Sequence, residues 1–177
     1  MKVFLGVLAA LALFPLPSAS ASAWTVKSVE QVNDETGAVV AVVEEGEQPD
    51  ALVDVGATGC KKVYVQYTRT NGGPGPASND LWKYRMEQGF CWNSRTNRVT
   101  SLYGFLREPI CCDPFWSWGG HVALSTTGWA GQWRVSRYTK GHFKFCLPWV
   151  GCVDHDYPWL RLTVYASGAW SRAGGNS

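Results

Sequence analysis

The chain has 177 residues, a formal net charge of +2 and 46% hydrophobic residues, among them ten tryptophans and six cysteines. Beyond residue 23 no stretch is apolar enough to cross a membrane, and no internal repeat is visible, which argues against a membrane-spanning protein and against a solenoid or propeller. The part of the chain that follows is long enough for one ordinary domain with a sizeable core.

Residues 1–23 have the composition of a secretory signal peptide. Lys2 gives a positive start, an apolar run spans Val3–Phe14, and Ala-Ser-Ala sites end at Ala21 and Ala23. The apolar run is too short to span a bilayer, so we expect cleavage rather than anchoring. The mature protein is therefore expected to be secreted and extracellular, and export disfavours a nucleic-acid partner.

Residues 24–59 form an acidic leader ahead of a basic body. The leader holds eight Asp and Glu residues against Lys27 alone, whereas residues 60–177 hold 14 Lys and Arg against 6 Asp and Glu. Valines beyond the turn-like segment Asn33–Gly37 leave two alternatives, a flexible solvated leader or a weak β-hairpin. The leader could also fold onto the body as an intramolecular mask. We place the β domain at 60–172 and a flexible tail at 173–177.

Two segments alternate between apolar and polar residues, as strands with one buried face do. The first is Cys60–Arg69, and the second, Leu81–Asn93, is rich in aromatic residues. A loop of Gly and Pro residues separates them, so we expect a hairpin. Keeping the two apolar faces together sets its register, and that register places Cys60 opposite Cys91. A cross-strand disulfide between these two cysteines is therefore predicted.

Shorter alternating segments follow, with Gly and Pro at close intervals and no helical periodicity. We expect strands at Arg98–Leu106, His121–Ser125, Gln132–Thr139, His142–Leu147 and Tyr157–Ala166. Lys140-Gly141 is interpreted as a hairpin turn between two of them. The pattern predicts an all-β fold, a small antiparallel sandwich or barrel of about 6–8 strands stabilised by disulfides.

Six cysteines in an exported chain predict disulfides. With Cys60–Cys91 assigned, a local bridge between Cys146 and Cys152 would leave Cys111 and Cys112 to form a strained vicinal bridge. In the other arrangement, Cys111 and Cys112 tie their loop to Cys146 and Cys152. We favour the local bridge. Zinc is the rival interpretation, but no Cys-x-x-Cys spacing supports it, and no metal ion or other cofactor is expected.

No catalytic motif is present, so no catalytic residue is assigned. The chain lacks a Gly-x-Ser-x-Gly elbow, and no pair of carboxylates stands out for glycoside hydrolysis. His121 lies beside Trp118 in the sequence and could sit in an aromatic cleft, which keeps a small secreted hydrolase as an alternative. The run Asp154–Asp156 could ligate a metal, but alternate loop residues rarely converge on one ion.

The tryptophans divide into an expected core group and an expected surface group. We assign Trp82, Trp92 and Trp133 to the core. The surface group lies in loops or on polar faces and, with His121, forms a candidate ligand-binding set: Trp116, Trp118, Trp129, Trp149 and Trp159. Planar rings on a rigid β face can stack against sugar rings. Basic side chains could flank them and favour acidic polymers: Arg107, Arg134, Arg137, Lys144 and Arg161.

We therefore expect a secreted, non-catalytic β module that binds polysaccharide or cell wall through loop aromatics. The alternatives are a structural or protein-interaction module of the cell envelope and the small hydrolase. The expected partner is accordingly an extracellular polysaccharide or an envelope protein.

A resemblance supports export and a single domain. The segments that carry it cover most of residues 60–172: Leu81–Tyr84, Phe90–Asn93, Arg98–Ser101, Cys146 with Cys152, Tyr157–Trp159 and Gly168–Ser171. In these segments the chain resembles a group of secreted β-rich proteins of actinobacteria. No activity is known to us for that group, so the resemblance implies none here.

Overall fold

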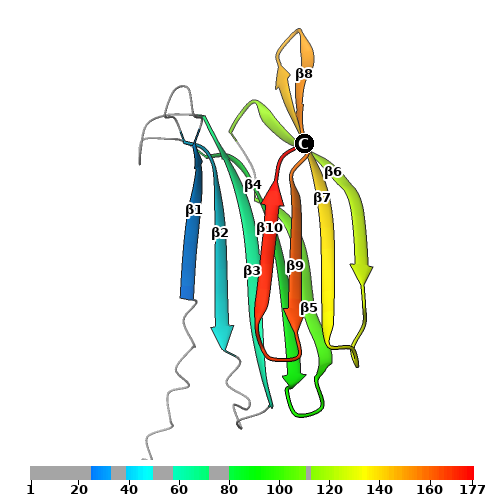
Figure 1. Ribbon diagram of the computed structural model, residues 1–177. Coiled ribbons are helices and arrows are strands. Elements are labelled where there is room, and N and C mark those ends of the chain that lie inside the picture. Colours follow the sequence, from blue (N-terminus) through cyan, green and yellow to red (C-terminus); the bar gives the residue numbers. More distant parts are fainter. Residues whose placement is uncertain (1–24, 33–38, 50–57, 72–79, 111–112) are drawn as a thin grey trace, which may run out of the picture.

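Two antiparallel sheets make up the protein in a computed structural model, which describes residues 25–32, 39–49, 58–71, 80–110 and 113–177 (Figure 1). Sheet A has the strand order β1-β2-β3-β4-β5, and sheet B has the order β10-β9-β7-β6 with β8 paired to β7. The strands of sheet A are β1 (Thr25–Val32), β2 (Val39–Pro49), β3 (Thr58–Thr70), β4 (Asp80–Asn93) and β5 (Arg98–Ile110). Those of sheet B are β6 (Trp116–Thr127), β7 (Arg134–Leu147), β8 (Gly151–Asp156), β9 (Trp159–Tyr165) and β10 (Trp170–Gly175).

The all-β, disulfide-stabilised fold class is confirmed, but the described residues form ten strands where we expected about six to eight. The additional strands come from segments that we expected to be leader, loop and tail. Sheet A packs on sheet B mainly through β3, β4 and β5 against β7, β9 and β10. The molecule is therefore a sandwich, in which each of these strands has one face toward the core and one outer face.

The core lies between the sheets and is rich in aromatic rings. On sheet A, the alternation of β3 and β4 turns Val65, Tyr84 and Met86 inward, all of them buried. The Trp82 ring stacks on Phe143 of sheet B with centroids 4.4 Å apart. The indole N–H of Trp82 donates to the carboxylate of Asp156, the last residue of β8, which satisfies its polar group within the core. Besides Phe143, the fully buried apolar side chains on the strands of sheet B are aliphatic: Val135, Leu160, Leu162 and Val164.

The predicted hairpin register is confirmed. Val65 lies opposite Met86, and Cys60 lies opposite Cys91. These two cysteines form a disulfide with Cα atoms 4.0 Å apart. The favoured local bridge is also present, because Cys146 and Cys152 pair across β7 and β8 and are bonded. The loop cysteines at 111 and 112 lie outside the described residues.

The turn predicted at Lys140-Gly141 is wrong, because β7 runs through it as one continuous strand. The Gly141 N–H donates to the carbonyl of Pro158 at 2.8 Å. A Cβ at Gly141 would lie 2.8 Å from the ring of Trp118. The glycine thus serves close packing of an aromatic ring rather than a change of chain direction.

The acidic leader follows the hairpin alternative. β1 and β2 pair with each other and β2 pairs with β3, so the leader extends sheet A. Glu45 accepts a hydrogen bond from Arg172, and Glu47 accepts one from the Trp170 indole at 2.7 Å. Acidic residues of β2 thus contact side chains of β10 in the other sheet. Opposite charge and strand pairing together explain why so short an apolar segment is ordered.

The expected flexible tail is wrong for residues 173–175, which continue β10. Ala173 pairs with Arg161 of β9, and the Asn176 amide donates to the Asp156 carboxylate. The short sequence Ser171–Gly175 has few apolar residues, so its strand character arises from pairing rather than from its own pattern. None of the described residues forms a helix long and apolar enough to cross a membrane.

Candidate functional site

Trp116 and Trp118 do not form a surface platform. Trp116 packs edge-on against Trp82, and Trp118 stacks on Tyr84 with centroids 5.6 Å apart. Both indoles are partly buried and lie against the core. Their spacing of two residues places them on the same face of β6, and that face is turned toward sheet A. We expected a loop where the chain forms a strand.

Trp129 and Trp149 are exposed but lie on separate turns. Trp129 is 68% exposed ahead of β7, and Trp149 is fully exposed at the tip of the β7–β8 hairpin, which projects beyond the other strands (Figure 1). Trp133, which we expected in the core, is 52% exposed. It precedes the first residue of β7, so the inward alternation does not extend to it, and its ring tilts onto Tyr165 at 6.0 Å.

His121 lies at the side of the sandwich beside β5. Its Nδ1 lies 3.1 Å from the Tyr84 hydroxyl, which is also 2.7 Å from the hydroxyl of Thr139. Its ring contacts Trp118 edge-on at 5.0 Å, as its position in the sequence suggested. Burial and the charge of Arg107 lower the pKa of His121. In the described part of the chain, no hydrogen bond joins His121 to a carboxylate.

The outer face of sheet B carries a groove with a volume of about 320 Å³. Val135 of β7 and Val164 of β9 point into the core, so the residues that alternate with them point outward. Three strands supply the lining of this outer groove: Ser125 and Thr127 from β6, Arg134, Ser136 and Tyr138 from β7, and Arg161, Thr163 and Tyr165 from β9. Strand pairing alone brings these residues together.

Small hydroxyl side chains form the floor of the outer groove, and aromatic rings stand at its ends. The Thr163 hydroxyl donates to that of Ser136 at 2.9 Å, leaving further lone pairs for a ligand. Tyr165 lies toward one end, and Tyr138 lies toward the other. The Trp159 ring stacks on Tyr138 with centroids 6.2 Å apart. Trp159, one of the predicted binding residues, therefore extends the aromatic wall.

The charge on this face has one sign. Strands β6, β7, β9 and β10 contain six Lys and Arg residues and no Asp or Glu. Two of the six, Arg137 and Arg172, contact Phe105 and Glu45 in the other sheet. The four others lie on the outer face: Arg134, Lys140, Lys144 and Arg161. Among the described residues none of these four forms an ion pair.

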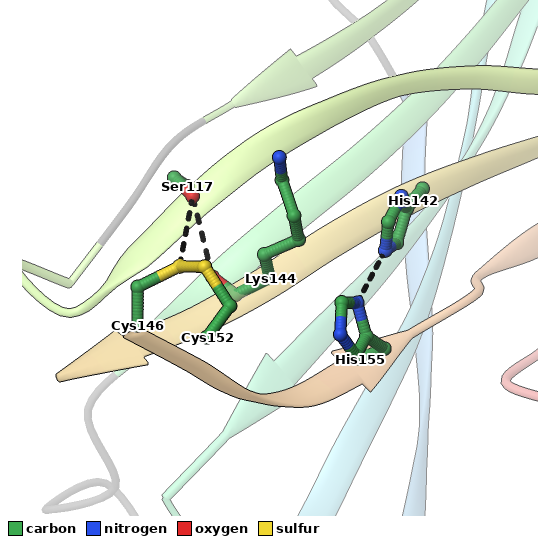
Figure 2. Close-up of a disulfide and its surroundings, with 6 residues drawn as sticks. All are labelled: Ser117, His142, Lys144, Cys146, Cys152 and His155. Carbon is green, nitrogen blue, oxygen red and sulfur yellow. Dashed lines mark hydrogen bonds between the residues drawn. A yellow bond between two sulfur atoms is a disulfide. The ribbon is translucent and has the colours of Figure 1, made fainter. Parts of the chain in front are cut away.

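Two histidines continue the same face beyond the groove. His142 of β7 and His155 of β8 approach so that Nε2 of the first lies 2.8 Å from Nδ1 of the second (Figure 2). Tyr157 stacks on His142 with centroids 4.6 Å apart. Burial lowers the pKa of His142, and the charges of His155 and Lys144 lower it further.

No protein-family model matches the chain, and no curated protein or solved structure shows significant similarity to it. The outer groove is therefore interpreted from its own chemistry.

Most residues of the outer groove escaped the sequence analysis, although one signal was present. Alternate residues of β7 are Arg134, Ser136, Tyr138 and Lys140. The first three lie within the strand predicted at Gln132–Thr139, so the turn expected at Lys140-Gly141 separated only Lys140 from this row. No local pattern indicated that residues of β6 and β9 would line the same groove, because these strands lie on either side of β7 only as a result of the strand order.

Proposed function

We propose that this protein is a non-catalytic module that binds an acidic polysaccharide along the outer face of sheet B. The observation that carries the proposal is the outer groove, which combines a hydroxyl floor, tyrosine rings and two arginines that form no ion pair within the described part of the chain. Sugar rings present hydroxyls to such a floor and apolar faces to such rings, while carboxylate or sulfate groups pair with guanidinium.

The shape of the site also suits an extended polymer. The outer row of β7 continues from Arg134 through Lys140 to Lys144, so cations recur along one strand direction. Residues two apart in a strand are separated by about 6.8 Å, and a polymer lying along β7 would meet cations at Arg134, Lys140 and Lys144 and a ring at Tyr138. A small anion would use only one of these positions.

Export completes the proposal, because such polymers lie outside the cytoplasm. The apolar segment Val3–Phe14 and two disulfides among the described cysteines support secretion.

The direct test measures binding of the protein to polygalacturonate and to neutral cellulose and chitin at low and high salt. We expect retention on polygalacturonate that salt weakens, because exposed charge pairs are screened. Arg161→Gln should weaken that binding about fivefold, since an exposed ionic contact contributes about 1 kcal/mol. Lys62→Gln is the matched control, because it removes an exposed cation from sheet A.

The proposal would be contradicted if Arg161→Gln bound as well as the wild type while Lys62→Gln bound less, because the site would then lie on sheet A. Retention on the neutral polymers that salt does not change would retain a sugar site but exclude acidic recognition. Tyr138→Ala distinguishes the contribution of ring stacking from that of charge. Its binding should be weaker than that of the wild type at high salt as well as at low salt.

A second candidate is a protein-interaction module of the envelope, and one surface favours it. Val122 and Leu124 on the edge strand β6 are about half exposed, and Leu106 on β5 is 41% exposed. The Arg107 side chain donates a hydrogen bond of 3.5 Å to the backbone carbonyl of Ala123, which lies between Val122 and Leu124 on β6. Apolar side chains beside a free strand edge suit strand addition by a partner. Leu124→Lys should abolish such association without changing polygalacturonate binding.

A further inference from the structure

Two imidazoles face each other where β8 leaves the sandwich. Figure 2 shows His142 on β7 and His155 on β8 with their rings joined at Nε2 and Nδ1, which lie 2.8 Å apart. The two residues are 13 positions apart in the sequence. Neither takes part in the outer groove, and neither is needed for the binding of polysaccharide proposed above.

The position of this histidine pair is set by three neighbouring features. Lys144 is the cross-strand partner of His155, so His155 lies diagonally from His142 on the same face. The Cys146–Cys152 disulfide closes the hairpin two residues beyond and fixes that register. Tyr157 lies nearly parallel to the His142 ring, at 7°. The two rings are thus held in place before any ligand arrives.

The nitrogen separation matches a particular metal geometry. Two metal–nitrogen bonds of about 2.0 Å place their nitrogens about 2.8 Å apart at 90°, and about 3.3 Å apart at a tetrahedral angle. The observed 2.8 Å is the length of the hydrogen bond between the two rings, and the same spacing fits adjacent positions of a square-planar ion that would replace the shared proton. Imidazole ligands in that geometry are typical of copper(II), which also binds more tightly than the other divalent ions of its row.

We propose that His142 and His155 form a copper(II) site, with Nε2 of His142 and Nδ1 of His155 in two adjacent equatorial positions. Among the described residues no third His, Cys, Asp or Glu converges with them, so water fills the other positions. The site is consequently open on its solvent side, where an external ligand can reach the ion.

The charges around the pair have opposite effects on a cation. Lys144 lies on the same face as His155 and disfavours a second positive charge. Asp154 precedes His155, and its carboxylate accepts the His155 backbone N–H at 2.8 Å. Lys140 is 5.3 Å from the Tyr157 ring centroid. Because these charges partly cancel, we expect a moderate affinity for the ion, and we expect removal of the Lys144 charge to raise that affinity.

The test is a copper(II) titration of the whole protein, followed by calorimetry and by electron paramagnetic resonance. We expect one ion per chain and a nitrogen pattern of two imidazoles. His142→Gln and His155→Gln should each weaken binding at least tenfold and leave a one-imidazole pattern. His121→Gln is the matched control, because the chain has three histidines and this one lies outside the pair.

Lys144→Gln should raise the affinity about threefold, because it removes a neighbouring positive charge that is partly screened by solvent. The site is refuted if all three histidine variants bind copper as the wild type does, or if the wild type shows one imidazole only. Tighter binding of zinc than of copper would refute the square-planar geometry. Circular dichroism of each variant checks that the fold is retained, and Lys144→Gln tests the site without altering a ligand.

Discussion

The outer faces of the two sheets differ in how their charges are arranged. On sheet A, Arg85 pairs with Glu87 at 2.6 Å and lies over the ring of Tyr64, which is buried beneath it. Lys83 likewise pairs with Asp80 at 2.7 Å. On sheet B, the outward cations have no carboxylate partners among the described residues, and the rings of Tyr138 and Tyr165 beside them are half-buried. A cation that is paired with a carboxylate is not available to an anionic ligand, whereas a cation without such a partner is.

The core is the part that both sheets share, and it gives the largest expected effect. Trp82→Ala removes the ring that stacks on Phe143 and leaves a cavity between the sheets. We expect a loss of about 3–5 kcal/mol in the free energy of unfolding, measured with urea. Trp149→Ala is the control, because that side chain is fully exposed and its removal should cost nothing measurable. Similar losses in both variants would contradict this account of the core.

The two disulfides allow the sheets to be compared directly. Cys60–Cys91 joins β3 to β4 across a separation of 31 residues, and Cys146–Cys152 joins β7 to β8 across a separation of 6. Since the entropy removed from the unfolded chain grows with loop length, replacement of the first pair by Ala should cost about 3.5 kcal/mol and of the second about 2 kcal/mol. Urea denaturation measures both. The reverse order would show that native packing, not loop closure, governs them.

Charge removal should affect the two faces differently. Glu87→Gln leaves the half-buried guanidinium of Arg85 without its carboxylate, so we expect a loss of about 1 kcal/mol in unfolding free energy. Arg161→Gln removes an exposed, unpaired cation and should change stability by less than about 0.5 kcal/mol. Thermal unfolding measures the effect of each variant on stability, and a separate assay of polygalacturonate binding measures its effect on binding. A larger stability loss in Arg161→Gln would contradict the difference between the faces.

The smallest expected effect is a pH dependence at the side of the sandwich. The pKa of His121 lies below its usual value of 6.5, so between the two values the unfolded chain binds the proton more readily. The free energy of unfolding is therefore unaffected by His121 protonation above about pH 6.5, and it declines as the pH falls toward the pKa of the folded state. His121→Gln should flatten the stability profile between pH 7 and 5, measured by urea midpoints. An unchanged slope would show that other groups cause it.

Local pattern was sufficient where a residue's partner lay on the next strand along the chain. The strict alternation around Tyr84 and Met86 allowed only one register with β3, because a slip of one residue would turn the apolar face to solvent. The same argument located Cys91 opposite Cys60. It failed at Trp118, whose role depends on the packing of β6 against β4 rather than on its neighbours in sequence.

Some residues in and beside the outer groove were named from the sequence, but their grouping was not. Trp159 and the cations at 134 and 161 were named as binding residues or their flanks, and the structure brings them to one face of sheet B. The tyrosines at 138 and 165 were not named, because nothing local distinguishes an outward ring from a core ring. Ser136 and Thr163 were missed for a similar reason, since a hydroxyl pair is common in any strand.

By itself, the sequence determined the all-β class, the hairpin of β3 with β4 and both described disulfides, because alternation and short separations act locally along the chain. Only the tertiary structure decided which face of sheet B stays open and that His142 meets His155. Those outcomes depend on strand order, with β9 placed beside β7 and β8 folded back on it. Strand order is settled by burial of the whole core, and no short segment contains it.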